Sequence, residues 1–228
     1  MIGIIGAMEI EVESIKKLLG DSRVKTVSGI DFVSGTYANQ SIVTAKCGVG
    51  KVFSALCAEA MILEYKPDMI INVGVAGCLS EKLKIGDIVI AEAVVQHDMD
   101  TSPLGDPVGM ISDINIVEIP TDKRICDALK KSVKNVGIRC ETGIIASGDQ
   151  FVADSGKKKY ITENFNAKAC EMEGASIGHV CYVNNVPFGV LRAMSDGAND
   201  GATIDFPTFA KMAAENSVKV IKEFLSLI

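Results

Sequence analysis

Short apolar runs alternate with amphipathic helical patterns along almost the whole chain of 228 residues. Such runs are typical of buried strands, and apolar residues at helical spacing are typical of helices that cover a sheet. We expect strands at residues 2–6, 31–37, 41–47, 68–75, 87–95, 138–147, 167–171 and 188–195, and helices at residues 8–19, 51–65, 122–136, 156–164, 174–183 and 206–227. This order predicts an α/β fold with a largely parallel central sheet and helices on both faces, made mixed by the hairpin-like stretch 23–47.

No linker, repeat or low-complexity segment divides this pattern, so residues 1–228 are expected to form one domain. The hydrophobic share of 48% is enough for a packed core. The least regular part is the stretch 96–120, which contains three prolines. In a compact domain, so long a loop usually has a function or covers a partner subunit.

The composition excludes several classes of protein. The 23 basic and 29 acidic residues give a net charge of −6, and only four of the basic residues are arginines, so no nucleic-acid groove is expected. Apolar stretches such as 69–76 are too short to span a membrane, and the N-terminal residues form no basic leader. Seven scattered cysteines without a Cys-x-x-Cys pair, together with two histidines, predict a reduced, cytoplasmic protein without a metal or a cofactor.

Polar and small residues collect where the expected strands end. In an open α/β sheet, ligands bind beyond the carboxyl ends of the strands. Six such ends stand out: residues 6–9, 48–50, 74–77, 147–149, 171–173 and 195–196. Five of them carry glycine or other small residues, and four carry carboxylates. Turn chemistry explains any one of them, but six together favour a pocket.

The three glutamates of the first expected helix differ in their angular distance from its apolar stripe. Its apolar stripe consists of Met8, Val12, Ile15 and Leu19. Glu9 and Glu13 point away from this stripe and are expected in solvent, whereas Glu11 lies about 60° from its centre. This angle places Glu11 at the boundary between core and solvent, where a functional role and a simple boundary charge remain equally open.

Three further charged residues stand at informative places. Glu173 precedes the segment 174–181, which is small or apolar on every side and therefore typical of a buried helix. The helix N-terminus would favour an ionised Glu173 that accepts hydrogen bonds from sugar hydroxyls, or Glu173 would simply cap the helix. Arg192 interrupts an apolar strand and needs a partner, for which Glu173 is a candidate, although a purely structural ion pair stays open. Asp196 follows that strand and could serve as a general acid.

Two nucleotide-binding motifs are incomplete in this sequence. Gly50-Lys51 resembles the end of a P-loop, but Val52 stands where a serine or threonine is required. The same segment lacks the third glycine of a dinucleotide fingerprint, because Phe53 occupies its position. His97 and His179 are expected to have structural roles.

The remaining constellation combines three carboxylates with an aromatic ring and thioethers: Glu11, Glu173, Asp196, Phe151, Met8 and Met172. Two carboxylates in acid and base roles around a sugar are the basis of glycoside hydrolysis. An aromatic ring and thioethers suit a nucleobase and a ribose face. The residues alone therefore favour a hydrolase of a small nucleoside-like molecule.

Five collinear segments resemble the bacterial 5′-methylthioadenosine/S-adenosylhomocysteine nucleosidases of the nucleoside phosphorylase superfamily. They are residues 4–11, 46–51, 147–151, the Glu-Met-Glu of 171–173 and the Arg-Ala-Met-Ser-Asp of 192–196. The resemblance implies a three-layer α/β/α domain, a homodimer with the loop 96–120 near the partner's pocket, and a role in methionine salvage. It also implies hydrolysis of the adenine–ribose bond of 5′-methylthioadenosine, S-adenosylhomocysteine and 5′-deoxyadenosine.

The resemblance also assigns roles to single residues. It implies that Glu11 activates the attacking water, that Asp196 protonates adenine at N7, and that Glu173, oriented by Arg192, holds the ribose hydroxyls. The remaining substrate-binding positions that it implies are Met172 against the sugar, Phe151 and Val152 at adenine, Met8, Val49 and Phe206 as walls of the sugar and alkylthio pocket, and Ser195 and Val75 beside them.

Two departures from the family and three alternatives remain. Many relatives carry serine at the position of Val75, and the partner loop here reads Thr-Ser-Pro-Leu-Gly around Leu104 instead of supplying an aromatic residue. The 5′ substituent therefore stays open, including the side chain of aminofutalosine. A phosphorylase would need arginines around the attack site, but three of the four arginines fall elsewhere, and Lys51 keeps this alternative open. A non-catalytic nucleoside-binding protein would not need all three carboxylates.

Overall fold

The computed structural model describes residues 1–197 and 206–228, with side chains from residue 209 onward in the second range. Its strands are β1 (Ile2–Gly6), β2 (Gly20–Val27), β3 (Ile30–Tyr37), β4 (Gln40–Lys46), β5 (Met69–Cys78), β6 (Ile88–Gln96), β7 (Ile119–Pro120), β8 (Cys140–Ser147), β9 (Ala167–Glu171) and β10 (Phe188–Met194). Its helices are α1 (Glu9–Lys16), α2 (Lys51–Tyr65), α3 (Lys123–Val136), α4 (Ser155–Phe165), α5 (Gly174–Val183) and α6 (Phe206–Leu227), with a short 3₁₀ turn at Ser102–Leu104.

The strands form one mixed sheet in the order β10-β6-β8-β9-β5-β1-β4-β3-β2, with β7 beside β6. Five of the ten strand pairings among the described residues are parallel, so the sheet is mixed as predicted but less parallel than expected. β10 also pairs with β5, and β9 pairs with both β8 and β5, so that five strands close into a ring. This closure brings the ends of β5, β9 and β10 close together.

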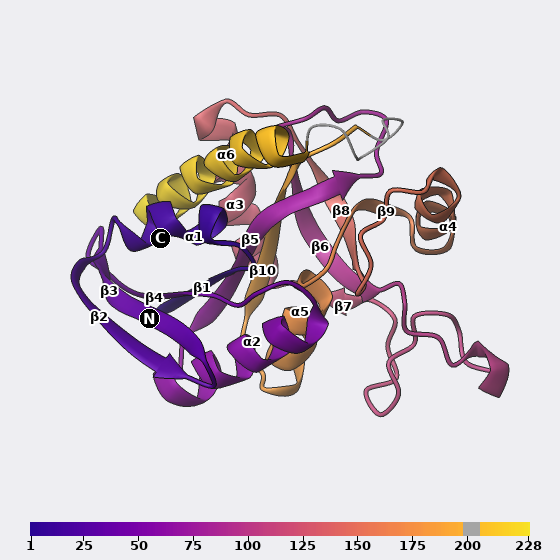
Figure 1. The fold of residues 1–228 in the computed structure, drawn as a ribbon, viewed down its shortest axis with the longest axis horizontal. Coiled ribbons are helices and arrows are strands. Elements are labelled where there is room, and N and C mark those ends of the chain that lie inside the picture. The colour runs from indigo at the N-terminus through magenta and orange to yellow at the C-terminus, as the bar shows by residue number, and fades with distance from the viewer. Residues whose placement is uncertain (198–205) are drawn as a thin grey trace.

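Helices cover the sheet in two layers (Figure 1). On one face, α1, α3 and α6 pack over a core that includes Ile15, Leu129 and Phe224. On the other face, α2 and α5 pack over a core that includes Met61 and Ile177. α4 lies at one side, against β8 and β9. The predicted three-layer α/β/α architecture is confirmed.

Local signals explain the helix boundaries. Asp122 caps α3 by accepting hydrogen bonds from the amides of Arg124 and Ile125, at 2.8 and 3.2 Å. The helix ends at Gly137, whose φ of 77° is the left-handed conformation that glycine adopts without strain. Predicted and observed bounds agree within a few residues for all six helices.

Three elements differ from the sequence-based expectation. β2 had no separate strand prediction, because nearly all its residues are exposed and give no apolar alternation. β7 and the 3₁₀ turn lie inside the stretch 96–120, which was expected to be irregular. This stretch projects from the body at the lower right of Figure 1, and Leu104 within it is 84% exposed.

All seven cysteines are free thiols, and six of them are buried. No helix within the described ranges is both long and apolar enough to cross a membrane. In the same part of the chain, no group of three His, Cys, Asp or Glu side chains is arranged to hold a metal ion.

Candidate active site

A pocket of about 200 Å³ opens where several strands end. Ten of the twelve predicted site residues line it: Met8, Glu11, Val49, Val75, Phe151, Val152, Met172, Glu173, Ser195 and Asp196. The lining also includes Ala7, Ala76, Gly77 and Glu171, which belong to the predicted strand ends, and Gln150 and Cys170, which do not. Arg192 lies behind the lining, and the side chain of Phe206 lies outside the described residues. The strand ends therefore form a common pocket, as the sequence predicted.

Glu11 is buried, with only 2% of its surface exposed. Its Oε2 accepts hydrogen bonds from the amides of Ala7 and Met8, at 2.7 and 2.9 Å, and its Oε1 accepts one from Val75 at 3.1 Å. The expectation of a boundary position was wrong, because the side chain bends back over the first turn of α1 rather than pointing outward. Burial raises the pKa of Glu11, although the Arg192 charge and the three amides oppose the shift. A carboxylate that binds a proton more readily is a better general base.

Arg192 pairs mainly with Glu171, not with Glu173 as expected. Its Nε and Nη2 both donate to Glu171 Oε2, whereas Nη2 is 3.9 Å from Glu173 Oε2. Glu171 also accepts hydrogen bonds from the amides of Glu173 and Gly174 and from the hydroxyl of Ser147. Glu171 is thus the residue that caps α5 and anchors the arginine. Burial alone would raise the pKa of Glu171, but Arg192 and these donors outweigh it and lower the pKa.

Glu173 is the second glutamate of the pair and has fewer donors. Its Oε1 accepts a hydrogen bond from the amide of Gly50 at 2.9 Å. Burial and the charge of Glu171 raise the pKa of Glu173 to about 8, despite the Arg192 charge. The expectation of an ionised Glu173 was wrong, because Glu171 already occupies the start of α5. At neutral pH the carboxyl group of Glu173 is mainly protonated and can both donate and accept hydrogen bonds.

This raised pKa makes the stability of the protein depend on pH. Folding raises the pKa of Glu173 from its ordinary value of 4.5 to about 8, so the folded state binds more protons between these pH values. The contribution of Glu173 to the free energy of unfolding therefore falls as the pH rises from 4.5 to 8, by an amount on the order of a few kcal/mol. Glu173→Gln should remove this fall. Urea unfolding at pH 5 and pH 9 measures this fall in the free energy of unfolding. In the control variant Glu163→Gln, at an exposed position, the fall should be as large as in the wild type.

Loss of the Arg192 charge should destabilise the fold strongly. Arg192→Met leaves the buried carboxylate of Glu171 without a cation, which is expected to cost about 3–5 kcal/mol of unfolding free energy. The matched control is Arg124→Met, because Arg124 forms an exposed pair with Asp122 that is worth about 0–1 kcal/mol. Equal losses in the two variants, measured by urea unfolding, would contradict the role of Arg192.

Asp196 stands two residues after the end of β10, and both its carboxyl oxygens are held. The amide of Cys78 donates to Oδ1 at 2.6 Å, and the ammonium of Lys158 donates to Oδ2 at 3.0 Å. The neighbouring Ser195 donates its hydroxyl to the carbonyl of Ala76 at 3.2 Å. Lys158 was not predicted, since a lysine in a run of three lysines is usually a surface residue.

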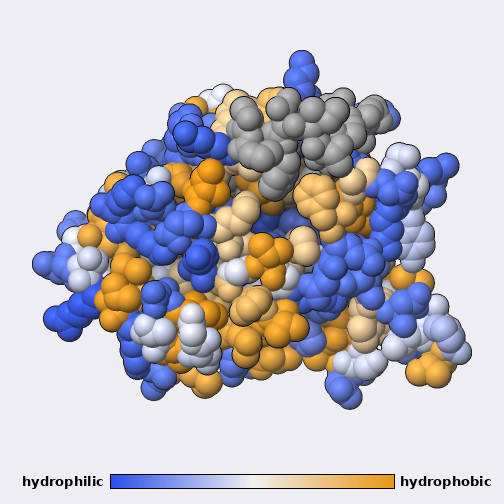
Figure 2. All heavy atoms as spheres, viewed as in Figure 1, coloured by the Kyte–Doolittle hydropathy of each residue, from blue (hydrophilic) through white to orange (hydrophobic). Residues whose placement is uncertain are grey.

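The remaining walls of the pocket are apolar. Met8, Val75, Val152 and Met172 are half-buried, while Val49 and Phe151 are 53% and 57% exposed. In Figure 2, several hydrophobic residues gather near the middle of the face shown, with hydrophilic residues around them. An apolar wall beside a few fixed polar groups is typical of a small-molecule site.

Lys51 does not point into the pocket. Its Nζ pairs with Asp98 at 2.6 Å, and its amide donates to Asp149 Oδ1 at 2.7 Å, which ties α2 to the loop after β8. His97 is buried as expected for a structural residue, but neither ring nitrogen has a hydrogen-bond partner among the described residues. His179 is half-buried, with Nδ1 3.4 Å from the amide nitrogen of Gln96.

The profile of the phosphorylase superfamily matches residues 1–226. The 5′-methylthioadenosine/S-adenosylhomocysteine nucleosidase of Shewanella loihica is 37% identical over 226 residues, which cover 98% of each chain. The structure of the Neisseria meningitidis enzyme of the same name, in complex with methylthio-immucillin-A, is similar with a TM-score of 0.96 and 34% identity, covering 100% of this chain and 99% of that one. Helicobacter pylori futalosine hydrolase is similar with a TM-score of 0.95 and 37% identity, covering 100% and 97%.

These similarities extend over the whole chain and are consistent with a pocket of carboxylates at the strand ends. The relatives are named as nucleosidases, so the chain is an enzyme of the glycosyl hydrolase type. It belongs to the 5′-methylthioadenosine/S-adenosylhomocysteine nucleosidase family of the phosphorylase superfamily.

Proposed function

We propose that this protein hydrolyses the N-glycosidic bond of 5′-methylthioadenosine and S-adenosylhomocysteine, and also of 5′-deoxyadenosine, and releases adenine. The observation that carries this proposal is the placement of two buried carboxylates along β5. Glu11 is bonded to the amide of Val75, and Asp196 to the amide of Cys78. Three residues of a strand separate these amides by roughly 10 Å, so one nucleoside can lie between an acid and a base.

The proposed reaction uses each carboxyl group once. Asp196 gives its proton to N7 of adenine, and the bond between C1′ and N9 breaks with its electron pair going to the base. Water adds to C1′ and loses a proton to Glu11, whose buried position favours proton uptake. General acid and general base assistance are typically worth about 10²–10⁴-fold each.

The other site residues would bind the substrate. A protonated Glu173 can both donate to and accept from the ribose hydroxyls, with Met172 against the sugar. Phe151 and Val152 would lie at adenine, and Ser195 beside it; Met8, Val49 and Val75 would line the ribose and 5′ side. Phe206, whose side chain lies outside the described residues, is proposed for the wall around the 5′ substituent. Arg192 would act through Glu171, to which it is bonded.

The lining of the pocket favours water over phosphate as the nucleophile. Four carboxylates face or border the described pocket, and no lysine or arginine is among its lining residues. Phosphate sites usually contain arginine or lysine, and buried carboxylates would repel the anion. Lys51, the candidate cation for a phosphorylase, is paired with Asp98 instead.

Hydrolysis of futalosine or aminofutalosine is the second candidate. It is favoured by the similarity to Helicobacter pylori futalosine hydrolase, at 37% identity over the whole chain. The two candidates share the bond that breaks and differ in the 5′ substituent of the substrate. Val49 lines the pocket and is 53% exposed, so the 5′ substituent would lie near solvent in either case.

The test is release of the base in phosphate-free buffer. We expect adenine from 5′-methylthioadenosine and S-adenosylhomocysteine. A larger kcat/KM for aminofutalosine than for either of these would support the second candidate. Release from none of them would contradict both proposals and favour a nucleoside-binding protein.

We also propose that residues 1–228 form one nucleosidase domain that acts in the cytoplasm in methionine salvage. It would form a homodimer, with the loop 96–120 near the partner's pocket. Val52, Phe53 and Leu56 of α2 support a dimer, since all three are large apolar side chains at least 47% exposed. Light scattering measures the mass, and a mass near 24.2 kDa would contradict the dimer.

A further inference from the structure

Two cationic side chains are buried in the part of the chain that the structure describes. One is Arg192, whose partner is Glu171 in the centre of the site. The other is Lys158 of α4, which is 6% exposed and lies behind the pocket lining. A buried ammonium group is costly unless it is paired, so its partner identifies what the lysine does.

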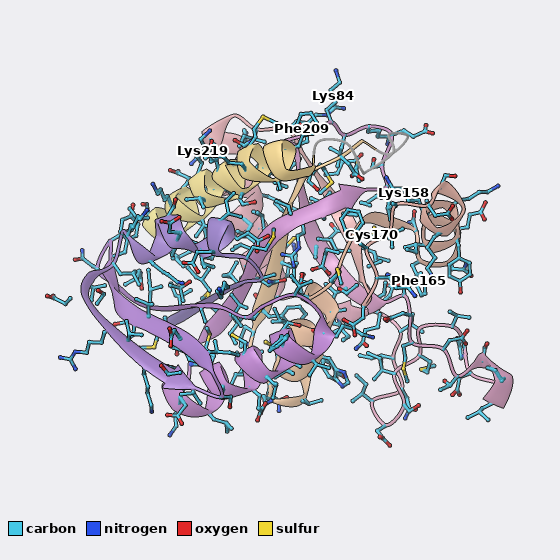
Figure 3. All side chains as sticks on the ribbon, in the orientation of Figure 1. Lys84, Lys158, Phe165, Cys170, Phe209 and Lys219 are labelled. Carbon is cyan, nitrogen blue, oxygen red and sulfur yellow. The ribbon has the colours of Figure 1, made fainter. Side chains whose placement is uncertain are left out.

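The partner of Lys158 is Asp196. Lys158 Nζ donates to Asp196 Oδ2 at 3.0 Å and to the carbonyl of Gly197 at 3.3 Å. The side chains of the pair are 7% and 11% exposed. Figure 3 shows Lys158 between α4 and the end of β5. Since the Cys78 amide of β5 holds Oδ1, the two carboxyl oxygens are fixed by two different elements.

The pocket thus contains two kinds of carboxylate. Glu171 and Asp196 each have a cation at hydrogen-bond distance. Glu11 accepts only backbone amides, and Glu173 accepts an amide while its nearest arginine nitrogen is 3.9 Å away. The residue proposed as the acid is therefore paired with a cation, and the residue proposed as the base is not.

We propose that Lys158 is the positioning residue for proton transfer by Asp196: it fixes the carboxyl group and compensates the negative charge that forms there. This inference rests on the proposed function of Asp196. When the carboxyl proton goes to N7 of the base, Asp196 becomes a carboxylate beside a fixed ammonium group. The ammonium keeps its own protons, and solvent supplies the next proton to Asp196. The fixed ammonium therefore stabilises the negative charge that develops on Asp196 during the transfer.

The other titratable groups around this pair do not replace the lysine. The thiols of Cys78 on β5 and Cys170 on β9 stay neutral, since burial raises their pKa values to about 11 and about 12. Glu171 on β9 is paired with Arg192, and Glu141 on β8 accepts a hydrogen bond from the hydroxyl of Ser80. Among the described residues, Lys158 is the cation that touches Asp196.

The neighbours of Lys158 provide the controls. Lys157 lies over the ring of Tyr160, with 5.1 Å from its nitrogen to the ring centre, and is half-buried. The side chain of Lys159 is 74% exposed and faces Glu163 at 3.7 Å. Lys159→Met therefore removes the same charge from the same helix without touching Asp196.

The test is the effect of Lys158→Met on kcat and KM for 5′-methylthioadenosine. Because Lys158 contacts Asp196 and lies outside the described pocket lining, this variant should lower kcat about tenfold or more and leave KM nearly unchanged. Lys158→Arg, which keeps the charge, should restore most of kcat, and Lys159→Met should match the wild type.

A second comparison separates this role from a structural one. In an Asp196→Asn background no charge forms at this position, so adding Lys158→Met should not lower the residual rate further. This double variant leaves no unpaired charge in the pair, which makes it suitable even if Lys158→Met alone does not fold. An unchanged kcat in Lys158→Met, a loss that appears in KM instead, or a loss of the same size in both backgrounds would overturn the inference. A wild type that releases no adenine at any pH would instead overturn the proposed function.

Discussion

Asp196→Asn is expected to abolish nearly all turnover and to leave nucleoside binding in place. An asparagine has the size of the aspartate and can still accept a hydrogen bond from the amide of Cys78, but it has no carboxyl proton to give to adenine. Loss of a general acid typically lowers kcat by about 10²–10⁴-fold. The rate of adenine release from 5′-methylthioadenosine measures kcat, and calorimetry with the slow variant measures binding.

The control for this variant is Asp127→Asn, which removes a carboxylate from the exposed face of α3. It should release adenine at the wild-type rate. Undiminished release by Asp196→Asn would contradict the assignment of the acid. Binding by wild type and variant with turnover by neither would favour a non-catalytic nucleoside-binding protein.

Glu11→Gln is expected to have an effect of similar size for a different reason. The carboxylate of Glu11 accepts three backbone hydrogen bonds, and burial raises its pKa, so it combines a fixed position with a tendency to take up a proton. A glutamine has no such basicity, so the attacking water is not deprotonated, and kcat should fall by about 10²–10⁴-fold. The measurement is the same adenine-release assay near neutral pH.

The matched control is Glu13→Gln, two residues further along α1 and exposed to solvent. It should keep the wild-type rate. Part of any loss in Glu11→Gln could come from folding, since the new amide group faces backbone donors. Urea unfolding of both variants accounts for that part. A folded Glu11→Gln enzyme with a rate within threefold of the wild type would contradict the role of Glu11 as the base.

The pocket was predictable because glycines and carboxylates gather at the ends of apolar runs. That signal correctly brought together residues as distant in sequence as Met8, Val75 and Asp196. The predictions that were wrong concern the direction of a side chain or its partner on another element. A helical wheel cannot show that Glu11 bends back over its own helix terminus, and the Glu-Met-Glu motif does not show which glutamate the arginine binds.

The sequence analysis also missed β2 and Lys158, because both depend on tertiary contacts. β2 is exposed along nearly its whole length and is held by pairing with β3, so its residues need no apolar period. Lys158 lies between two other lysines, and only its contact with Asp196 distinguishes it from them. In each case the deciding interaction is tertiary and joins segments that the sequence does not place next to each other.

The most direct test of the central claim is chromatography of the products formed from 5′-methylthioadenosine, with and without inorganic phosphate. We predict adenine and free methylthioribose in equal amounts in both buffers, because the pocket offers a buried base for water and its described lining contains no cation for phosphate. Methylthioribose 1-phosphate, formed only when phosphate is present, would contradict hydrolysis and identify the protein as a phosphorylase.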